Sequence, residues 1–303
     1  MDRFETLRKH LTKQMTGLEI GPFFSPVVAK ADGWNTLVVD YTDGASLREI
    51  ARNHAAEAIR SAAHRIEEVD AVWHGEPLDT IFPERNPGWA DYVVASHVIE
   101  HVPDILGFLQ QCSRVLGPQG IISLAVPDMR KCFDLLKSPT SIRDVLVAHR
   151  ERRTRHSPET LFEARAYAVG REGGGAWVAG DHTRLRFAGG LRDAWKLYQA
   201  DVEALSQASP SYVDAHAWYF TPAGFELVVL ELNTLGLIDF SIHSLEPNPG
   251  SEFIVQMRRG SQNLDDEEMA KRRLALALRR YAEFEDEVAA TYRPGKGAAA
   301  LGG

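Results

Sequence analysis

The sequence predicts an α/β fold, a sheet with helices on both of its faces, and three observations support this prediction. An apolar strand ends in a glycine turn and is followed by a second strand that ends on an acid, all within 16–40. A second strand–helix–strand alternation follows in 89–128. Hydrophobic residues make up 44% of the 303 residues, enough to bury the core of one large domain or of a core domain with an insertion.

The stretch 16–40 reads TGLEIGPFFSPVVAKADGWNTLVVD and predicts a strand–helix–strand unit. The first strand turns sharply at Gly21-Pro22. We expect a helix from about Ser25, because the proline that follows it is favoured at a first helical position. The second strand ends on Asp40. This carboxylate lies about 20 residues past the turn, where an acid can accept hydrogen bonds from a ribose diol.

The residues after Gly21 restrict which nucleoside ligands the turn can bind. Dinucleotide sites use several glycines so that backbone N–H groups can approach a pyrophosphate. Here Pro22 has no N–H to donate, and Phe23 and Phe24 form an apolar wall. The turn therefore favours an adenosine ligand without phosphates and argues against a nicotinamide oxidoreductase.

The elements around this unit are simpler to assign. Residues 1–15 predict an N-terminal amphipathic helix, because Phe4, Leu7 and Leu11 fall on one stripe. This helix either caps the ligand site or covers the edge of the sheet. Residues 41–70 are mostly helical in pattern, and a short strand at 69–73 is followed by a loop that carries Glu76.

The stretch 89–128 reads WADYVVASHVIEHVPDILGFLQQCSRVLGPQGIISLAVPD. Its first strand ends at Ser96-His97, and Asp104 opens a helix with one apolar face. Residues 117–120 predict a turn before a buried strand. Ligands of parallel sheets bind beyond the carboxyl ends of the strands, so Ser96, His97 and the nearby His101 are candidate contacts.

Two motifs resemble class I S-adenosylmethionine-dependent methyltransferases. They are the Glu19-x-Gly21 turn and the E-H-V-P-D sequence at 100–104, and the resemblance covers residues 16–128. Within that class the chain looks like a bacterial type 11 or ubiquinone-biosynthesis-like methyltransferase domain with a substrate-lid insertion. The resemblance implies a Rossmann-like seven-stranded sheet of order 3-2-1-4-5-7-6 with an antiparallel last strand. It also implies S-adenosylmethionine as cofactor and S-adenosylhomocysteine as product.

The resemblance and the strand ends together assign the cofactor contacts. In this family an acid in the loop after the third strand commonly faces the adenine, and Glu76 is the acid at that position here. The alternative is that Glu76 is only a solvent-exposed loop residue. His101 could instead stabilise its own loop. The candidate cofactor-binding residues are Glu19, Gly21, Pro22, Asp40, Tyr41, Glu76, Ser96, His97 and His101.

A long insertion follows the fifth predicted strand. We expect a methyltransferase core at 16–130 and 216–260, interrupted at 131–215 by a mainly helical substrate lid with Gly173–Gly175 as a mobile segment. A rigid cap or a dimer surface is the alternative.

The core resumes with a helix that opens at Thr221-Pro222 and with a strand pair at 238–243 and 252–258. The remainder, 261–303, predicts a long charged helix suited to oligomerisation and a disordered tail from Gly295.

Two acid–histidine pairs flank the expected acceptor pocket. They are Asp181-His182 in the lid and Asp214-x-His216 before the sixth helix. Methyl transfer to a hydroxyl needs a base for the hydroxyl proton, and histidine titrates near neutral pH. We therefore expect His216, oriented by Asp214 or a neighbouring carboxylate, to be the base, with His182 as the alternative. The same four residues could instead bind Mg²⁺ that orients a diol.

The acceptor is predicted less directly. Trp177, Trp195 and Trp218 lie in or beside the lid, and aromatic faces pack on sugars, although tryptophan also fills cores. The basic run 149–156 could bind the phosphate of a nucleotide sugar or a lipid-linked saccharide, or it is a solvated helix end. We expect O-methylation of a sugar or another small hydroxylated metabolite. The alternatives are N- or C-methylation of a natural product and cofactor binding without catalysis.

Composition excludes other classes of protein. The formal net charge of −8 argues against a nucleic-acid binder. No apolar run approaches the roughly 20 residues of a membrane span, and the first residues lack a secretory apolar segment. Cys112 and Cys132 are too few for a disulfide framework. These features predict a cytoplasmic protein.

Overall fold

The computed structural model describes residues 2–178, 183–206, 212–248, 250–262 and 264–291. The chain divides into two compact units, which we describe separately. The first comprises 1–126, 232–246 and 254–262, and the second comprises 127–231, 247–253 and 263–303. Among the described residues, no helix is long and apolar enough to cross a membrane.

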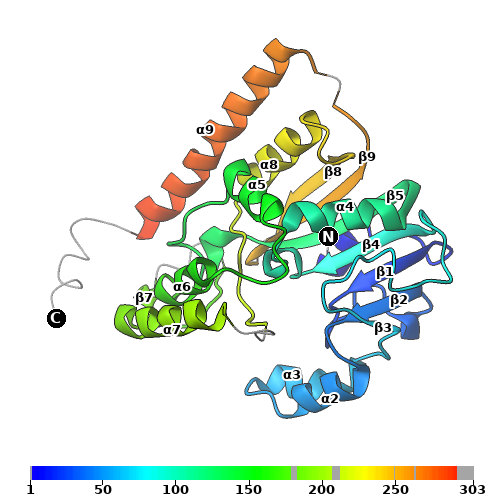
Figure 1. The fold of residues 1–303 in the computed structure, drawn as a ribbon, viewed down its shortest axis with the longest axis horizontal. Coiled ribbons are helices and arrows are strands. Elements are labelled where there is room, and N and C mark those ends of the chain that lie inside the picture. Colours follow the sequence, from blue (N-terminus) through cyan, green and yellow to red (C-terminus); the bar gives the residue numbers. More distant parts are fainter. Residues whose placement is uncertain (1, 179–182, 207–211, 249, 263, 292–303) are drawn as a thin grey trace. The chain divides into compact units, whose positions relative to one another are not determined.

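A seven-stranded mixed sheet forms the core of the first unit, in the order β3-β2-β1-β4-β5-β9-β8 (Figure 1). Its strands are β1 Thr16–Ile20, β2 Asn35–Asp40, β3 Ala71–Val72, β4 Ala90–Ser96, β5 Leu116–Pro127, β8 Phe240–Pro247 and β9 Glu252–Arg259. The pairs β2–β3, β1–β2, β1–β4 and β4–β5 are parallel. Because β6 and β7 form a separate sheet, β8 and β9 are the sixth and seventh strands of this one in chain order. The predicted fold class and the strand order 3-2-1-4-5-7-6 are therefore confirmed.

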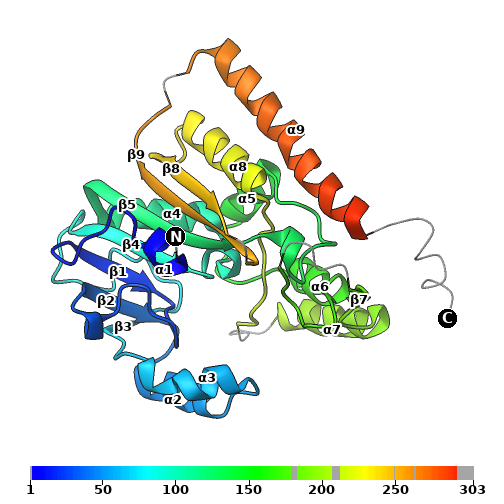
Figure 2. The same ribbon diagram turned by 180° about the vertical axis from the view of Figure 1, so that it is seen from behind.

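Helices cover both faces of this sheet. Helix α4 (Ile105–Val115) lies on one face, and the short helix α1 (Arg3–Leu7) lies on the other (Figures 1 and 2). Asp104 caps α4 by accepting a hydrogen bond from the Gly107 N–H at 2.9 Å, as expected of an N-cap acid. The helices α2 (Gly44–Arg52) and α3 (Glu57–Ala62) follow β2.

The N-terminal segment packs as predicted but is helical for a shorter length. Leu7 and Leu11 are buried in one cluster, and Phe4 packs against it. The helix ends at Leu7, and His10 adopts a left-handed backbone with φ of 70°. Backbone carbonyls there are bonded to the sheet instead, since Ser123 Oγ donates to Leu7 O at 2.7 Å. The segment therefore covers the sheet, and the prediction of a helix through residue 15 is wrong.

Two further local predictions are corrected. No helix begins at Ser25, and the only helical turn between β1 and β2 is a 3₁₀ turn at Lys30–Asp32. Residues 117–120 belong to β5 rather than to a turn outside it, and the register with β4 shifts between Ala90 and Tyr92. Four residues of β5 lie between these two pairs against one residue of β4, so the pairing of the two strands is irregular there.

Close packing inside the sheet requires one glycine. Tyr92 on β4 is fully buried, and its ring lies beside Gly17 on β1. A Cβ atom at Gly17 would come within 2.2 Å of that ring. The Tyr92 hydroxyl is bonded to Thr36 Oγ1 on β2, so this buried polar group is satisfied.

The second unit is mainly helical. Its elements are α5 Ile142–Arg150, α6 Pro158–Ala166, the antiparallel pair of β6 Val169–Gly170 and β7 Arg186–Phe187, α7 Leu191–Ala204, most of α8 Pro222–Thr234, and α9 Asp266–Thr291. Helices α6 and α7 pack together through an ion pair between Arg165 and Asp201. Helix α9 packs on α8, where Met269 and Leu276 meet Leu227 and Leu230.

The glycine segment 173–175 forms a tight turn in which Arg171 and Gly174 exchange two backbone hydrogen bonds of 3.0 Å. Its mobility stays a prediction. The predicted disordered tail at 295–303 lies outside the described residues.

Candidate active site

Three parallel strands bring the predicted cofactor residues to one edge of the sheet. Ile20 at the end of β1 is aligned with Val39 on β2 and with Ala95 on β4. Gly21, Asp40 and Ser96 follow or occupy these strand ends, so they lie at a common edge. This is the edge at which open α/β sheets bind ligands.

Glu19 organises the loop that replaces the expected helix. Its buried carboxylate accepts hydrogen bonds from the N–H groups of Val27 at 2.5 Å and of Val28 at 3.1 Å. These two bonds attach the backbone of Val27 and Val28 to the end of β1. Burial raises the pKa of Glu19 to about 7, although the two backbone bonds act in the opposite direction. Glu19 thus shapes the site, and its direct contact with a cofactor stays a prediction.

The turn after β1 requires a glycine at its first position. Gly21 has φ of +63°, and a Cβ atom there would lie 2.9 Å from Val98 Cγ2. Phe23 also adopts a left-handed conformation, with φ of 43°, which is strained for a bulky residue. Phe23 and Phe24 pack against the cluster around Leu47 rather than exposing N–H groups in an anion nest. Pro22 lies between them and Gly21, as the sequence requires.

Of the residues at this edge, Asp40 has the surroundings best suited to binding the ribose of a nucleoside. Its side chain is buried, and Oδ1 accepts a hydrogen bond from the Tyr41 N–H at 2.8 Å. Oδ2 is also buried and has no hydrogen-bond partner among the described residues. Burial raises the pKa of Asp40 to about 6, against smaller opposing effects from the N–H groups of Tyr41 and Phe23. A buried acceptor without a donor is costly, and the hydroxyls of a ribose diol would satisfy it.

The end of β4 gathers two histidines around one acid. His97, with φ of 55°, places Nδ1 at 3.3 Å from Glu100 Oε1, and His101 places Nε2 at 3.8 Å from the same oxygen. Glu100 is buried while His97 is exposed. Ser96 Oγ accepts a hydrogen bond from Arg3 at 2.6 Å. Sequence reasoning missed Glu100 as a site residue, although an acid three residues after one histidine and beside another was a readable signal.

The remaining two cofactor candidates are on the surface. Tyr41 is exposed at the end of β2. Glu76 is exposed too, and its carboxylate accepts a hydrogen bond from the His74 N–H at 2.8 Å within its own loop. The adenine contact assigned to Glu76 stays a prediction.

The second unit contains a buried charged cluster around His216. His216 Nδ1 is 2.6 Å from Asp134 Oδ2, and Lys137 Nζ is 2.6 Å from Asp134 Oδ1. Asp134 and Lys137 are both buried. The Lys137 ammonium also lies over the ring of Tyr219, 4.6 Å from its centroid. Burial disfavours the charge of Asp134, but His216 and Lys137 together hold the pKa of that carboxyl below its usual value.

Of the two orienting groups expected for His216, Asp214 or a neighbouring carboxylate, the structure places the carboxylate of Asp134 against Nδ1. Asp214 accepts a hydrogen bond from the Tyr212 hydroxyl at 3.2 Å. Asp181 and His182, the other predicted pair, lie outside the described residues. Sequence reasoning missed Asp134 and Lys137, even though two opposite charges three residues apart inside the apolar run CFDLLK indicated a buried pair.

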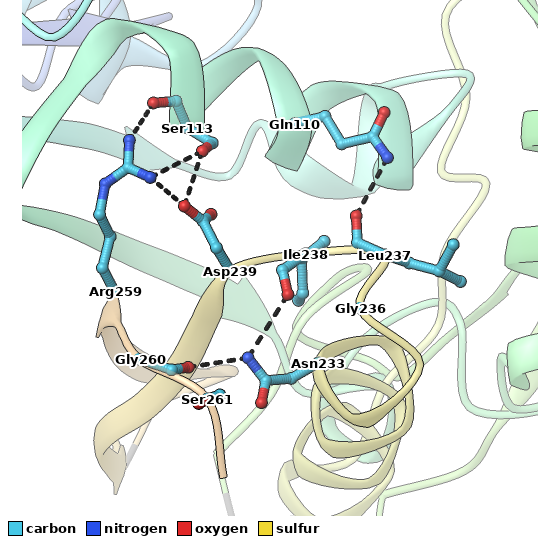
Figure 3. Close-up of a pocket in the computed structure, with 10 residues that line it drawn as sticks. All are labelled: Gln110, Ser113, Asn233, Gly236, Leu237, Ile238, Asp239, Arg259, Gly260 and Ser261. Carbon is cyan, nitrogen blue, oxygen red and sulfur yellow. Dashed lines mark hydrogen bonds and ion pairs between the residues drawn. The ribbon is translucent and has the colours of Figure 1, made fainter. Parts of the chain in front are cut away.

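A hollow of about 560 Å³ elsewhere in the first unit is not a convincing ligand site. It lies between the C-terminal half of α4, the loop that joins α8 to β8, and the end of β9 (Figure 3). Its polar groups are already paired, since Arg259 donates to Leu116 O at 2.8 Å and forms an ion pair with Asp239. The Asn233 amide likewise donates to Gly260 O at 2.8 Å. These bonds join loops and leave little for a ligand to satisfy.

Comparisons with known proteins identify the family of the chain. A family model described as a methyltransferase domain matches residues 6–170, more than half of the chain. The matched region contains the Gly21 turn, Asp40 and the 100–104 motif. No curated protein sequence matches the chain.

Solved structures with similar folds share little sequence with this chain. The trans-methyltransferase CalH in complex with SAH is 16% identical, with a TM-score of 0.36, and the match covers 81% of this chain and 51% of CalH. A putative S-adenosylmethionine-dependent methyltransferase from Listeria monocytogenes is 13% identical, with a TM-score of 0.40 and coverage of 85% and 98%. The CcbJ methyltransferase from Streptomyces caelestis is 10% identical, with a TM-score of 0.42 and coverage of 86% and 97%.

The chain spans only about half of CalH, and at these TM-scores none of the three structures identifies an acceptor for it. The assignment rests on the family model. The chain belongs to the methyltransferase domain family and is a class I S-adenosylmethionine-dependent methyltransferase.

Proposed function

We propose that this enzyme methylates a hydroxyl group of a small acceptor, a sugar or another hydroxylated metabolite, with His216 as the general base. The observation that carries the proposal is the 2.6 Å contact between His216 Nδ1 and the buried Asp134 carboxylate. An acid held in this way fixes the Nδ1–H tautomer of the imidazole, so the lone pair is on Nε2. Hydroxyl oxygens need such a base, whereas an amine can attack as its free base.

The residues of the first unit fit the cofactor. When bound, S-adenosylmethionine supplies an electrophilic methyl group on a sulfonium. Asp40 would hold the ribose diol through its unsatisfied Oδ2, and the left-handed turn at Gly21 would admit the amino-acid portion. The chain enters the second unit at Pro127, where β5 ends. The insertion therefore leaves the sheet at the edge where the cofactor residues lie.

The protein's part in the reaction is positioning and proton removal. His216 would accept the hydroxyl proton on Nε2 as the oxygen attacks the methyl carbon. Asp134 would then stabilise the imidazolium that forms. Lys137 keeps Asp134 ionised within the buried cluster, since its ammonium is one of the groups that lower the pKa of that carboxyl. The cluster is thus prepared before substrate arrives.

The acceptor class rests on Trp195. Trp177 and Trp218 are buried and serve the core, whereas Trp195 is 52% exposed. Its ring stacks on Tyr198 with centroids 5.2 Å apart and stands edge-on to Phe162 at 6.4 Å. A rigid aromatic face of this kind packs on the apolar face of a sugar. The basic run 149–156 gives weaker support for a nucleotide sugar, because Arg150 and Arg153 already pair with Glu151.

A cytoplasmic location is part of the proposal, whereas a bound metal is an alternative to the histidine base. The two thiols of Cys112 and Cys132 are buried, in keeping with a protein of the reducing cytoplasm. Mg²⁺ at Asp181, His182, Asp214 and His216 is a competing arrangement. It predicts that EDTA abolishes turnover, whereas the histidine mechanism predicts turnover without added metal.

The test compares histidine variants on an acceptor found by screening hydroxylated and amino compounds for methyl incorporation. His216→Ala should lower kcat by ~10²–10⁴ and leave the Kd of S-adenosylhomocysteine unchanged within about twofold. The exposed His64→Ala is the matched control and should retain full activity. If His216→Ala retains its turnover and His182→Ala loses it, the base is His182 and the proposal fails.

A further inference from the structure

Helix α9 has two different faces, and the second of them has no known role. One face carries Met269 and Leu276, which pack on α8. The opposite face presents Leu274, Leu278 and Tyr281, which share one side of the helix because they are spaced four and three residues apart. These three side chains are 61%, 61% and 68% exposed, which is high for large apolar residues on one stripe. Figures 1 and 2 both show α9 alongside α8.

The stripe continues at both ends with opposite charges. Lys271 precedes Leu274 by three residues, and Glu285 follows Tyr281 by four. The positions 271, 274, 278, 281 and 285 therefore alternate in steps of three and four, the spacing of a helix–helix seam. The apolar centre is flanked by a cation on its N-terminal side and an anion on its C-terminal side.

Two arginines near the middle of α9 are engaged within the same unit, while Arg280 lies over the ring of Tyr281, 5.3 Å from its centroid. Arg273 pairs with Glu231 at 2.7 Å, and Arg279 pairs with Glu226 and Glu283. They hold α9 on α8 and leave the outward stripe with an apolar middle. Among the described residues Lys271 pairs with Glu267 at 2.6 Å, an exposed contact that contributes little to stability.

We propose that the outward stripe of α9 binds the α9 stripe of a second copy of this chain in an antiparallel pair centred on Leu278. The pattern is self-complementary in that orientation alone. Lys271 lies seven residues before Leu278 and Glu285 lies seven residues after it. Two antiparallel copies therefore place each Lys271 opposite a Glu285, twice by symmetry, while a parallel pair would place like charges together.

The packing at the centre of this pair is feasible. Small side chains, Ala275 and Ala282, lie beside the stripe on α9 and would accept the larger side chains of the facing helix. Two-fold pairing through one self-complementary patch is the commonest architecture of soluble oligomers. This inference is independent of the acceptor and of the identity of the base.

The experiment measures the association of the full-length chain by sedimentation equilibrium. The wild type should form a dimer, and Leu278→Glu should weaken association at least ~100-fold because it places two like charges at the centre of the seam. Leu235→Glu is the matched control, since Leu235 is also 61% exposed but lies outside α9, and it should leave the dimer intact. Circular dichroism and the Tm of each variant verify that it folds.

Charge exchange tests the antiparallel orientation. Lys271→Glu and Glu285→Lys should each weaken the dimer, and the double variant should restore it. A wild type that remains monomeric at roughly 100 μM overturns the proposal, as does a dimer that survives Leu278→Glu. Binding of the monomeric wild type to phosphatidylcholine–phosphatidylserine vesicles would assign the stripe to a lipid surface and would also overturn it.

Discussion

Asp40 predicts a specific pH dependence of cofactor binding. Burial raises the pKa of its carboxyl to about 6, so in the free protein it is mostly protonated at pH 5 and mostly ionised at pH 7. The donors of a ribose diol favour the ionised form. Cofactor binding should therefore release a proton near pH 6 and should be tighter above that pH.

The magnitude follows from the same pKa. With a pKa of about 6, roughly one tenth of the carboxyl groups are ionised at pH 5 and roughly nine tenths at pH 7. If only the ionised form binds well, the Kd of S-adenosylhomocysteine should be about tenfold higher at pH 5 than at pH 7. Asp40→Asn should abolish this slope and should cost about 1.5–3 kcal/mol at pH 7, the value of hydrogen bonds to a charged group.

The assay is titration calorimetry with S-adenosylhomocysteine across pH 5–8. Repeating it in two buffers of different ionisation enthalpy gives the number of protons released. Subtracting the Asp40→Asn profile removes the ligand's own titration. Asp43→Asn is the matched control, because Asp43 is an exposed cap of α2 three residues away. Equal slopes in the wild type and in Asp40→Asn would refute the role assigned to Asp40.

Three further predictions concern the turn, the buried cluster and the loop. Gly21→Val should abolish detectable S-adenosylhomocysteine binding in the same calorimetric assay. The reason is that the backbone φ of +63° disfavours any side chain at this position, and a Cβ atom there would crowd Val98. Normal affinity in the variant would contradict this prediction. Lys137→Met should destabilise the fold by ~3–5 kcal/mol in urea unfolding, because it removes the buried ammonium that pairs with Asp134 and leaves that carboxylate with its contact to His216. The exposed Lys196→Met, which breaks the similarly spaced pair with Asp193, should cost under ~1 kcal/mol, and equal effects would refute the argument. The pKa of Glu19 is raised from 4.5 to about 7 in the fold, so its stabilising contribution is complete below pH 4.5 and is lost as the pH rises through 7. Relative to Glu19→Gln, the unfolding free energy of the wild type should fall across that range, and a difference independent of pH would show that the buried acid does not titrate there.

The sheet was predictable from sequence because its signals are local. Strand–turn–strand alternation and the acid that ends β2 are readable within short windows, and the 100–104 motif fixes the β4 end. The strand order 3-2-1-4-5 with a final pair then follows from the family resemblance. The cap at Asp104 and the apolar face of α4 were equally readable, since capping and helical periodicity depend on neighbours within one or two turns.

The errors arose where distant residues decide the outcome. The helix expected from Ser25 is absent, and the loop in its place is attached to β1 by the buried Glu19, which accepts hydrogen bonds from the N–H groups of Val27 and Val28. The partner of His216 is Asp134, 82 residues earlier, and no local pattern connects them. A sequence can show that a histidine and an acid are available, but their pairing depends on how the insertion folds.

The central claim, that this methyltransferase delivers its methyl group to a hydroxyl oxygen, has one direct test. S-adenosylmethionine labelled with ¹³C at the methyl carbon is incubated with the enzyme and a panel of hydroxylated and amino acceptors, and the product is examined by NMR. We predict that the labelled carbon appears as an O-methyl resonance and that its yield falls together with kcat in Asp134→Asn. A label found on nitrogen or carbon, formed at the same rate in Asp134→Asn, would contradict the claim.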